Sequence, residues 1–226
     1  MKTLVLLLLS FFSWIPSGVG QGLEIIIKDN QLDIQHSEVL RLSYLAADQF
    51  QKLDWEPGYA YYPDGSSKQF EGMKYDPSQD LIQVSTGGYI LTLLPGVIDG
   101  VSMEIENVVT RIFVKVPMKK AVFMEVLSSG RLNLLIYRKV KDESAQMDDN
   151  KVTVRFEKAE EIIKFEEELY VWGPKGVYKL KGSNKSLLSM MSDYSADIEE
   201  FLDENSIKSK DVADLKRVFD YYNGLD

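Results

Sequence analysis

The sequence predicts an α+β domain, in which a mainly antiparallel β-sheet forms a roll or a sandwich and is closed by two C-terminal helices. Three observations predict this class. Between Gly58 and Val140, short segments rich in Tyr, Val, Ile, Leu and Phe alternate with turn-forming residues. A further hairpin follows at 167–180, around the Gly173-Pro174-Lys175 turn. Only the C-terminal segment shows sustained helical spacing of its apolar residues.

The N-terminus predicts a secretory signal peptide over residues 1–20. Lys2 precedes an uncharged apolar run from Thr3 to Ile15, and Gly18 and Gly20 supply the small residues of a cleavage site. We therefore expect cleavage before Gln21. A retained transmembrane anchor needs about 20 apolar residues, which is more than this run contains. The prediction is export to the periplasm, the cell envelope or the medium, with no transmembrane anchor after cleavage.

Composition limits the class of protein. The chain has 26 basic and 35 acidic residues and a net charge of −9, and loss of Lys2 with the signal would make it −10. This acidic balance argues against nucleic-acid partners, which are bound through clustered Lys and Arg. Cysteine is absent, unlike in small disulfide-rich extracellular modules, so a bacterial envelope or secreted protein is favoured. Residues 21–226 have a length suited to a single domain.

The strands are expected to form an antiparallel meander with short turns. A first strand or a lead-in is expected at 23–27, and the apolar pattern over 37–53 is mixed between helical and extended. Residues 141–151 are expected to form a polar loop, and 157–168 either a helical turn or part of a strand. The remaining expected strands cover 59–62, 68–75, 81–85, 89–94, 101–109, 111–116, 121–127, 131–140, 152–156, 167–172 and 176–180.

The tail, about 186–223, is expected to form two helices that dock on the sheet. In the first, apolar residues recur at steps of three and four until Asn205 and Ile207 end the helix. Ser209 is a candidate N-cap for the second helix. The two apolar stripes consist of Leu187, Leu188, Met191, Tyr194, Ile198, Phe201 and Leu202, and of Val212, Leu215, Val218, Phe219 and Tyr222.

No catalytic, cofactor-binding or metal-binding residue is predicted. His36 is the only histidine, so catalytic triads and zinc sites built from His and Cys lack their residues, and His36 itself is interpreted as an idle surface residue. The acidic residues are interpreted as solvated faces rather than as a pair of catalytic carboxylates; the candidates are Glu166, Glu167 and Glu168, or Asp193 and Asp197. Asp142, Asp148 and Asp149 lack the spacing of a calcium loop.

Aromatic residues leave two interpretations open. Trp55, Tyr59, Tyr61 and Tyr62 could line a surface that binds a sugar or a peptide, because aromatic rings offer a large amphipathic contact area. Tyr is also a favourable strand residue, and we favour this second reading. No ligand-binding residue is assigned.

The C-terminal segment IEEFLDENSIKSKDVADLKRVFDYYNGL ends in a DL...V.YYN pattern. It resembles the closing segment of a group of small exported proteins of unknown function from Bacteroidota, and the resemblance extends upstream to Leu42. It implies an architecture and a compartment, and no activity or site. A Lys-rich excess found in many members of the group is missing here. The pattern is matched by Asp214, Leu215, Val218, Tyr221, Tyr222 and Asn223, and the upstream matches are YYPDGSSKQFEGMKYDPSQDLIQV, EVLSSGRLNLLIYRKV and YVWGPKGVYKLKGSNKSLLSMM.

The functional prediction is an exported, non-enzymatic protein that binds an unknown protein or small-molecule partner in the bacterial cell envelope. Two alternatives are a carrier that holds an apolar ligand in a cupped sheet and a hydrolase that depends on carboxylates. The hydrolase needs two acids in a cleft, and the carrier needs an apolar cavity. A protein that only contacts a partner needs neither feature.

Overall fold

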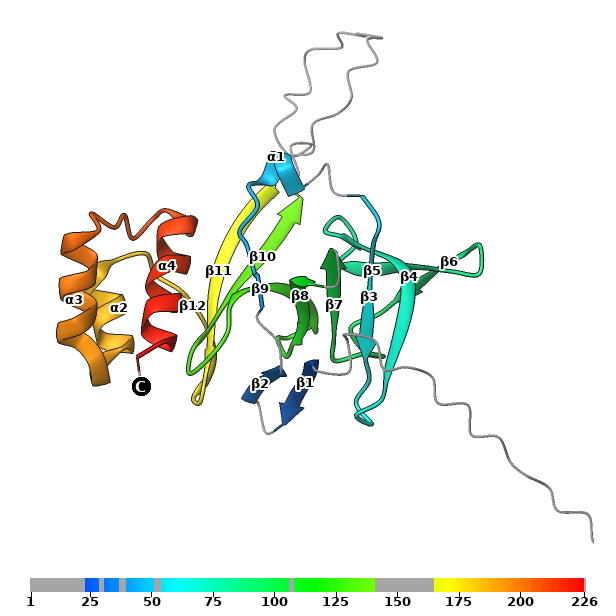
Figure 1. Cartoon of the computed structure of the whole chain (residues 1–226), viewed down its shortest axis with the longest axis horizontal. Coiled ribbons are helices and arrows are strands. Elements are labelled where there is room, and N and C mark those ends of the chain that lie inside the picture. Colours follow the sequence, from blue (N-terminus) through cyan, green and yellow to red (C-terminus); the bar gives the residue numbers. More distant parts are fainter. Residues whose placement is uncertain are drawn as a thin grey trace, which may run out of the picture.

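The computed structural model describes residues 23–28, 31–36, 40–50, 54–105, 108–140 and 165–225, without the side chains of residues 36, 47, 48 and 105. It shows an α+β fold with a ten-stranded antiparallel sheet, a separate two-stranded hairpin and C-terminal helices (Figure 1). The predicted signal peptide, the polar loop at 141–151, the strand at 152–156 and most of 157–168 lie outside the described residues.

The large sheet has the order β12-β11-β10-β9-β8-β7-β3-β4-β5-β6. It is therefore two meanders joined side by side, and not the single meander that the sequence predicted, because β7 pairs with β3 instead of β6. The strands are β3 (Glu56–Tyr61), β4 (Ser67–Asp76), β5 (Leu81–Thr86), β6 (Tyr89–Leu93), β7 (Gly100–Ile105), β8 (Val108–Val116), β9 (Val122–Ser128), β10 (Asn133–Val140), β11 (Phe165–Gly173) and β12 (Gly176–Lys179).

The junction of β3 with β7 depends on a glycine. A Cβ atom at Gly58 would lie 2.0 Å from the backbone oxygen of Ser102, so no larger residue fits there without a shift of the backbone.

The predicted single strand over 101–109 was wrong, since β7 ends at Ile105 and β8 begins at Val108, antiparallel to it. The dipeptide between the two strands, Glu106-Asn107, contains no Gly or Pro to mark the reversal in the sequence.

Of the two alternatives for residues 23–27, the structure shows a strand, and its partner was not anticipated. β1 (Leu23–Lys28) pairs with β2 (Gln31–His36), and this hairpin packs on one face of the large sheet. We call the contact the hairpin cluster. Its buried members are Leu23, Ile25, Leu32, Ile34, Tyr59, Tyr61, Val109, Ile112, Val114, Val116, Val122, Met124, Val126, Leu135, Tyr170 and Trp172.

The sheet curls, so strands far apart in its order come into contact. The backbone N–H of Phe123, at the start of β9, donates to Asp80 in the β4–β5 turn over 3.1 Å. The Tyr75 and Phe113 rings lie 4.8 Å apart between centroids. We call the apolar contact inside this curl the roll cluster. Its buried members are Phe50, Ala60, Phe70, Met73, Tyr75, Ile82, Val84, Ile98, Val101, Met103, Phe113 and Phe123.

The tail docks on the sheet as predicted, but the first expected helix is broken. It is divided into α2 (Asn184–Met190), a 3-10 turn at Ser192–Tyr194, and α3 (Ser195–Glu204). The apolar residues before and after the break still pack in one cluster, as expected if the helix were continuous. This tail cluster contains Leu127, Leu132, Leu134, Ile136, Val171, Leu180, Leu187, Met191, Ile198, Leu202, Leu215, Val218, Phe219 and Tyr222.

The last helix, α4 (Val212–Asn223), is confirmed, with a different cap from the one predicted. The Asp211 side chain, and not that of Ser209, accepts the backbone N–H of Asp214 over 3.1 Å. At its C-terminal end, Asn223 bonds to the β9–β10 connection. Its amide group donates to the Leu132 carbonyl over 2.9 Å and to Ser128 Oγ over 3.2 Å. The YYN end of the tail pattern therefore anchors a helix to the sheet.

Candidate functional site

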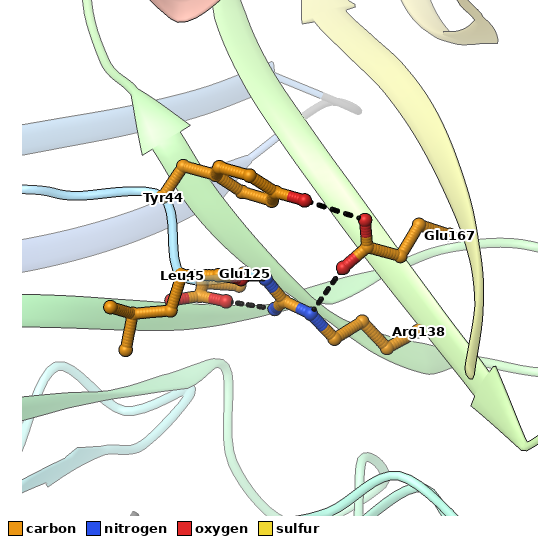
Figure 2. A network of polar contacts seen from close by, with 5 residues as sticks. All are labelled: Tyr44, Leu45, Glu125, Arg138 and Glu167. Carbon is orange, nitrogen blue, oxygen red and sulfur yellow. Dashed lines mark hydrogen bonds and ion pairs between the residues drawn. The ribbon is translucent and has the colours of Figure 1, made fainter. Parts of the chain in front are cut away.

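A buried charged network fastens the segment before α1 (Ala47–Phe50) to the sheet (Figure 2). Arg138 on β10 forms an ion pair with Glu125 on β9 and donates from Nε to Glu167 on β11 over 3.1 Å. Its Nη2 donates to the backbone oxygen of Leu45 over 2.9 Å. The Tyr44 hydroxyl donates to the second oxygen of Glu167 over 2.9 Å. One guanidinium thus joins three strands to the incoming chain.

An aromatic ring completes the surroundings of this guanidinium. The Arg138 Cζ lies 4.2 Å from the centroid of the Phe50 ring, at the end of α1. Both Arg138 and Glu125 have side chains only 1% exposed. An Arg guanidinium has no acceptor atom, so this side chain can only donate hydrogen bonds. The arrangement is suited to holding Tyr44, Leu45 and Phe50 in place.

The ionisation behaviour of the network follows from its burial. Burial raises the pKa of the Glu125 carboxyl, and the Arg138 guanidinium opposes this change. Burial and the neighbouring Glu167 carboxylate raise the pKa of Tyr44 to about 12. Tyr44 therefore stays protonated near neutral pH and can keep donating its hydrogen bond.

A second buried pair lies nearby on the same face of the sheet. Arg111 on β8 forms an ion pair with Glu56 on β3. Within the described residues, Glu56 Oε2, Arg111 Nε and Glu125 Oε1 have no hydrogen-bond partner. A hollow of about 20 Å³ borders Arg111, which is enough for about one water molecule and far too small for a substrate.

A larger cavity opens beside this network, where the end of β4 approaches the end of β10 and the start of β11. Its volume is about 450 Å³. Three aromatic side chains in its wall are packed edge to face. The Phe50 ring lies 6.3 Å from that of Tyr75 and 6.1 Å from that of Phe165. Because Phe50 also covers Arg138, the charged network supports the cavity wall.

Trp55 is the fourth aromatic residue of the lining. It lies against Gly72 on β4, where a Cβ atom would be 3.1 Å from the Trp55 Cβ and 3.4 Å from its Cε3. A glycine at this position leaves room for the indole. The half-buried Trp55 thus forms one side of the cavity, and Val140 and Pro77 add further apolar surface.

The polar lining consists of Lys74, Asp76, Ser78 and Gln83. Asp76 is the single carboxylate among them, and the β4–β5 turn uses it. It accepts the Ser78 backbone N–H over 2.9 Å and the Gln79 amide over 3.0 Å. Lys74 forms no ion pair with any residue in the described ranges. The cavity therefore offers one positive charge that is not neutralised there.

A hydrogen bond holds the Tyr75 wall in position. The Tyr75 hydroxyl donates to Asp80 over 3.0 Å, and the Phe123 N–H donates to the same oxygen. Burial raises the pKa of Tyr75 well above its usual range and also raises the pKa of Asp80. Since the Tyr75 hydroxyl stays protonated at physiological pH, its hydrogen bond to Asp80 holds the ring in place at these pH values.

The structure separates the four aromatic residues that could have lined one surface. Tyr59 and Tyr61 are buried in the hairpin cluster, and Tyr62 packs partly buried against the roll cluster. They do not share a surface with Trp55. For the tyrosines, the interpretation as strand residues is supported, whereas Trp55 lines a cavity.

The acidic candidates are scattered as well. Glu167 belongs to the buried network, and Glu166 is exposed. Glu168 contacts Lys139 over 3.2 Å and Lys179 over 3.0 Å. Asp193 accepts the Tyr222 hydroxyl and is part of the tail docking, far along the chain from the β11 acids. None of these carboxylates lines the cavity.

Glu168 carries a testable pH dependence. The Tyr170 hydroxyl, together with Lys179 and Lys139, lowers the pKa of Glu168 to about 2. A lowered pKa means that Glu168 contributes stability above its ordinary pKa and loses that contribution as the pH falls toward 2. We expect Glu168→Gln to flatten the loss of unfolding free energy between pH 5 and pH 2, measured by urea denaturation.

The exposed neighbour on the same strand provides the control. Glu166→Gln should retain the wild-type slope of stability against pH. Identical slopes for wild type and Glu168→Gln would show that the Glu168 ion pairs are not formed in solution.

The other candidates have little structural support. His36 is the last residue of β2, and Asp142, Asp148 and Asp149 lie outside the described residues. In the described ranges no group of three His, Asp or Glu could hold a metal ion. No helix in this part of the chain has the length and apolar character needed to cross a membrane.

Sequence reasoning missed Phe50, Lys74, Tyr75 and Phe165. No local pattern marks them, because they come from three segments, α1, β4 and β11, that meet only when the sheet curls. The signal available in the sequence was weak: Lys74, Tyr75 and Asp76 lie just before a predicted turn, where strand ends often carry function.

Comparison with known proteins identifies no relative. No protein-family model, curated protein or solved structure matches this chain. The resemblance to exported proteins of Bacteroidota therefore stays a prediction.

Proposed function

We propose that this chain is an exported, non-enzymatic binding protein that holds a small planar ligand with an anionic group in the cavity beside α1. One observation carries the proposal. Four aromatic residues and Lys74, which forms no ion pair in the described ranges, line the same cavity of about 450 Å³. This volume is within the range of about 300–1,000 Å³ that is typical of small-molecule sites.

The lining suggests the class of ligand. The faces and edges of Phe50, Trp55, Tyr75 and Phe165 favour a flat apolar group. Lys74, on the rim formed by β4, would attract a carboxylate or a sulfonate. Gln83, which pairs with Lys74 across β4 and β5, adds an amide donor and acceptor next to the charge.

Two alternatives have less support. A hydrolase that depends on carboxylates needs two acids about 5–9.5 Å apart, and Asp76 is the single acid of the described lining and is bonded within its turn. A carrier for a purely apolar ligand would not need Lys74, Ser78 and Gln83 in the wall. A small anion with an aromatic part would contact both the aromatic and the polar residues of the lining.

Export is part of the proposal and depends on the N-terminal pattern of Lys2, the apolar run and Gly18 with Gly20. A protein recovered from the periplasm or the medium should have the mass of residues 21–226. Recovery of the intact chain from the cytoplasm would contradict export. It would not affect the proposed binding site, which the ligand titration tests separately.

The cavity is tested with 1-naphthoate, a two-ring apolar anion, by isothermal titration calorimetry. We expect saturable 1:1 binding, and a Kd about 5- to 10-fold higher for Lys74→Met, because one charge-assisted contact contributes about 1 kcal/mol or slightly more. Neutral 1-naphthalenemethanol should bind both proteins equally. Trp55 emission should change on binding, whereas Trp172 is fully buried in the hairpin cluster.

The matched control is Lys68→Met, which removes an exposed lysine from the same strand outside the lining. It should bind 1-naphthoate like the wild type. Absence of saturable binding up to millimolar ligand, or an equal loss in both lysine variants, would refute the proposed site.

A further inference from the structure

The β6 edge of the large sheet is apolar and exposed. β6 pairs with β5 and is the last strand of the described sheet, at the opposite end of the molecule from the tail helices (Figure 1). Tyr89 is 74% exposed, Ile90 65% and Leu91 47%. Soluble proteins rarely leave a run of large apolar side chains in water without a binding role.

The surroundings of β6 also lack charge. No charged residue occurs from Leu81 through Ile98, although charged residues make up 27% of the chain. The stretch includes Leu94 and Val97, each 50% exposed. Exposed edges are usually protected by Lys, Pro or bulges, and β6 itself contains none of these.

The opposite edge of the sheet provides a contrast within the same molecule. β12 has only four residues, begins at Gly176 and carries Lys179. Short length and a lysine are common means of blocking strand addition. Of the two edges, β6 is therefore the one that can accept another strand.

The turn before β6 determines which backbone groups face outward. Gly87 and Gly88 have φ values of +55° and +80°, as a two-residue hairpin turn requires, and Thr86 pairs with Tyr89 across it. In such a hairpin the closing pair exchanges hydrogen bonds, and bonded pairs alternate along the strands. The N–H and C=O groups of Ile90 and Thr92 therefore point away from β5.

We propose that β6 pairs with β6 of a second copy of this chain, antiparallel and centred on Leu91. In this register Ile90 of each copy is opposite Thr92 of the other, so the outward groups of both residues form four backbone hydrogen bonds. Leu91 of one copy lies opposite Leu91 of the other, and Tyr89 of one copy lies opposite Leu93 of the other. The result is one sheet that continues across both molecules.

The choice of a second copy is based on complementarity and charge. The outward hydrogen-bonding groups are symmetric about Leu91, as a two-fold axis requires. Each copy has a net charge of −9, yet the uncharged stretch 81–98 places no like charges opposite each other at the contact. A five-residue strand buries little area, so the dimer is expected to be weak and to exchange with the monomer.

Sedimentation equilibrium of the purified protein from 5 to 500 μM tests this pairing. Thr92→Pro removes an N–H that faces away from β5, so it should block pairing and leave β6 in place, weakening association by at least about 10-fold. Thr92→Val keeps that N–H and should dimerise like the wild type. A wild-type protein that remains a monomer throughout this range, or equal association of the two variants, would overturn the proposal.

Cross-linking gives an independent measurement, because the chain has no cysteine. Leu91→Cys places a thiol on the two-fold axis, in a non-hydrogen-bonded pair whose Cα atoms should be about 4.5 Å apart. Val97→Cys is the control, with similar exposure and no counterpart in this register. Leu91→Cys should form disulfide dimers about 10-fold faster, and equal rates would contradict the register.

Discussion

Arg138→Met is expected to lower the free energy of unfolding by about 3–5 kcal/mol. The substitution keeps much of the side-chain volume and removes the guanidinium that contacts Glu125, Glu167 and the Leu45 carbonyl. Glu125, which is 1% exposed, then loses the guanidinium that pairs with it, and its pKa rises further. Urea denaturation followed by circular dichroism measures the change.

Two further variants separate the charge effect from simple loss of packing. Arg131→Met removes an arginine whose side chain is 38% exposed and should cost less than about 1 kcal/mol. Combining Arg138→Met with Glu125→Leu removes both buried charges and should recover a substantial part of the lost stability. A loss below about 1 kcal/mol in Arg138→Met would show that the network does not hold the fold together.

The same variant links the fold to the cavity. Arg138 supports Phe50 from beneath, and Phe50 contacts both Tyr75 and Phe165 in the cavity wall. Loss of the guanidinium should therefore weaken 1-naphthoate binding even at temperatures where the variant remains folded. Unchanged binding in a folded variant would show that the wall keeps its shape without the network.

Phe219→Ala should lower the free energy of unfolding by about 3–5 kcal/mol, because it leaves a cavity between α4 and the sheet. Phe219 is fully buried in the tail cluster, together with Leu215 and Val218 of the same helix. Its ring has no route to solvent, so the neighbouring side chains can fill the space only partly. The measurement is again urea denaturation.

Phe201→Ala is the matched control within the tail. Phe201 is half-buried on α3 and stacks on Tyr221 with the ring centroids 4.2 Å apart. We expect a loss of only about 1–2 kcal/mol, since part of the ring already contacts water. Equal losses for the two variants would mean that the tail packs less specifically than the structure shows.

The boundaries of most strands were predictable, because their signals are local. The turn at Pro63-Asp64-Gly65-Ser66 and the Gly87-Gly88 turn lie where the residue types predict them, and Gly65, Gly87 and Gly88 have positive φ values. The tail helices were found from their apolar period, and Phe219 and Leu215 occupy the buried side as that period requires. The break after α2 was missed, since apolar spacing continues across it.

The candidate site was mostly unpredictable, because its residues share no local pattern. Trp55 was noticed as an aromatic residue, but it was grouped with Tyr59 and Tyr61, which point into another cluster. Tyr75 and Phe165 are 90 positions apart in the numbering and line one cavity. Arg138 and Glu125 read as ordinary strand charges, and nothing near them in the sequence indicates that both are buried.

Local chemistry in the sequence was enough to establish the α+β class, the antiparallel hairpins and the apolar faces of the tail, because turn residues and periods of two or 3.6 act over a few neighbours. Tertiary structure decided that β3 lies beside β7, that the sheet curls until Asp80 reaches Phe123, and that a cavity opens there. An apolar pattern that repeats every two residues shows which side chains share a face of a strand. This pattern does not show which strands pair or what covers each face, since strand pairing and coverage depend on contacts between distant segments.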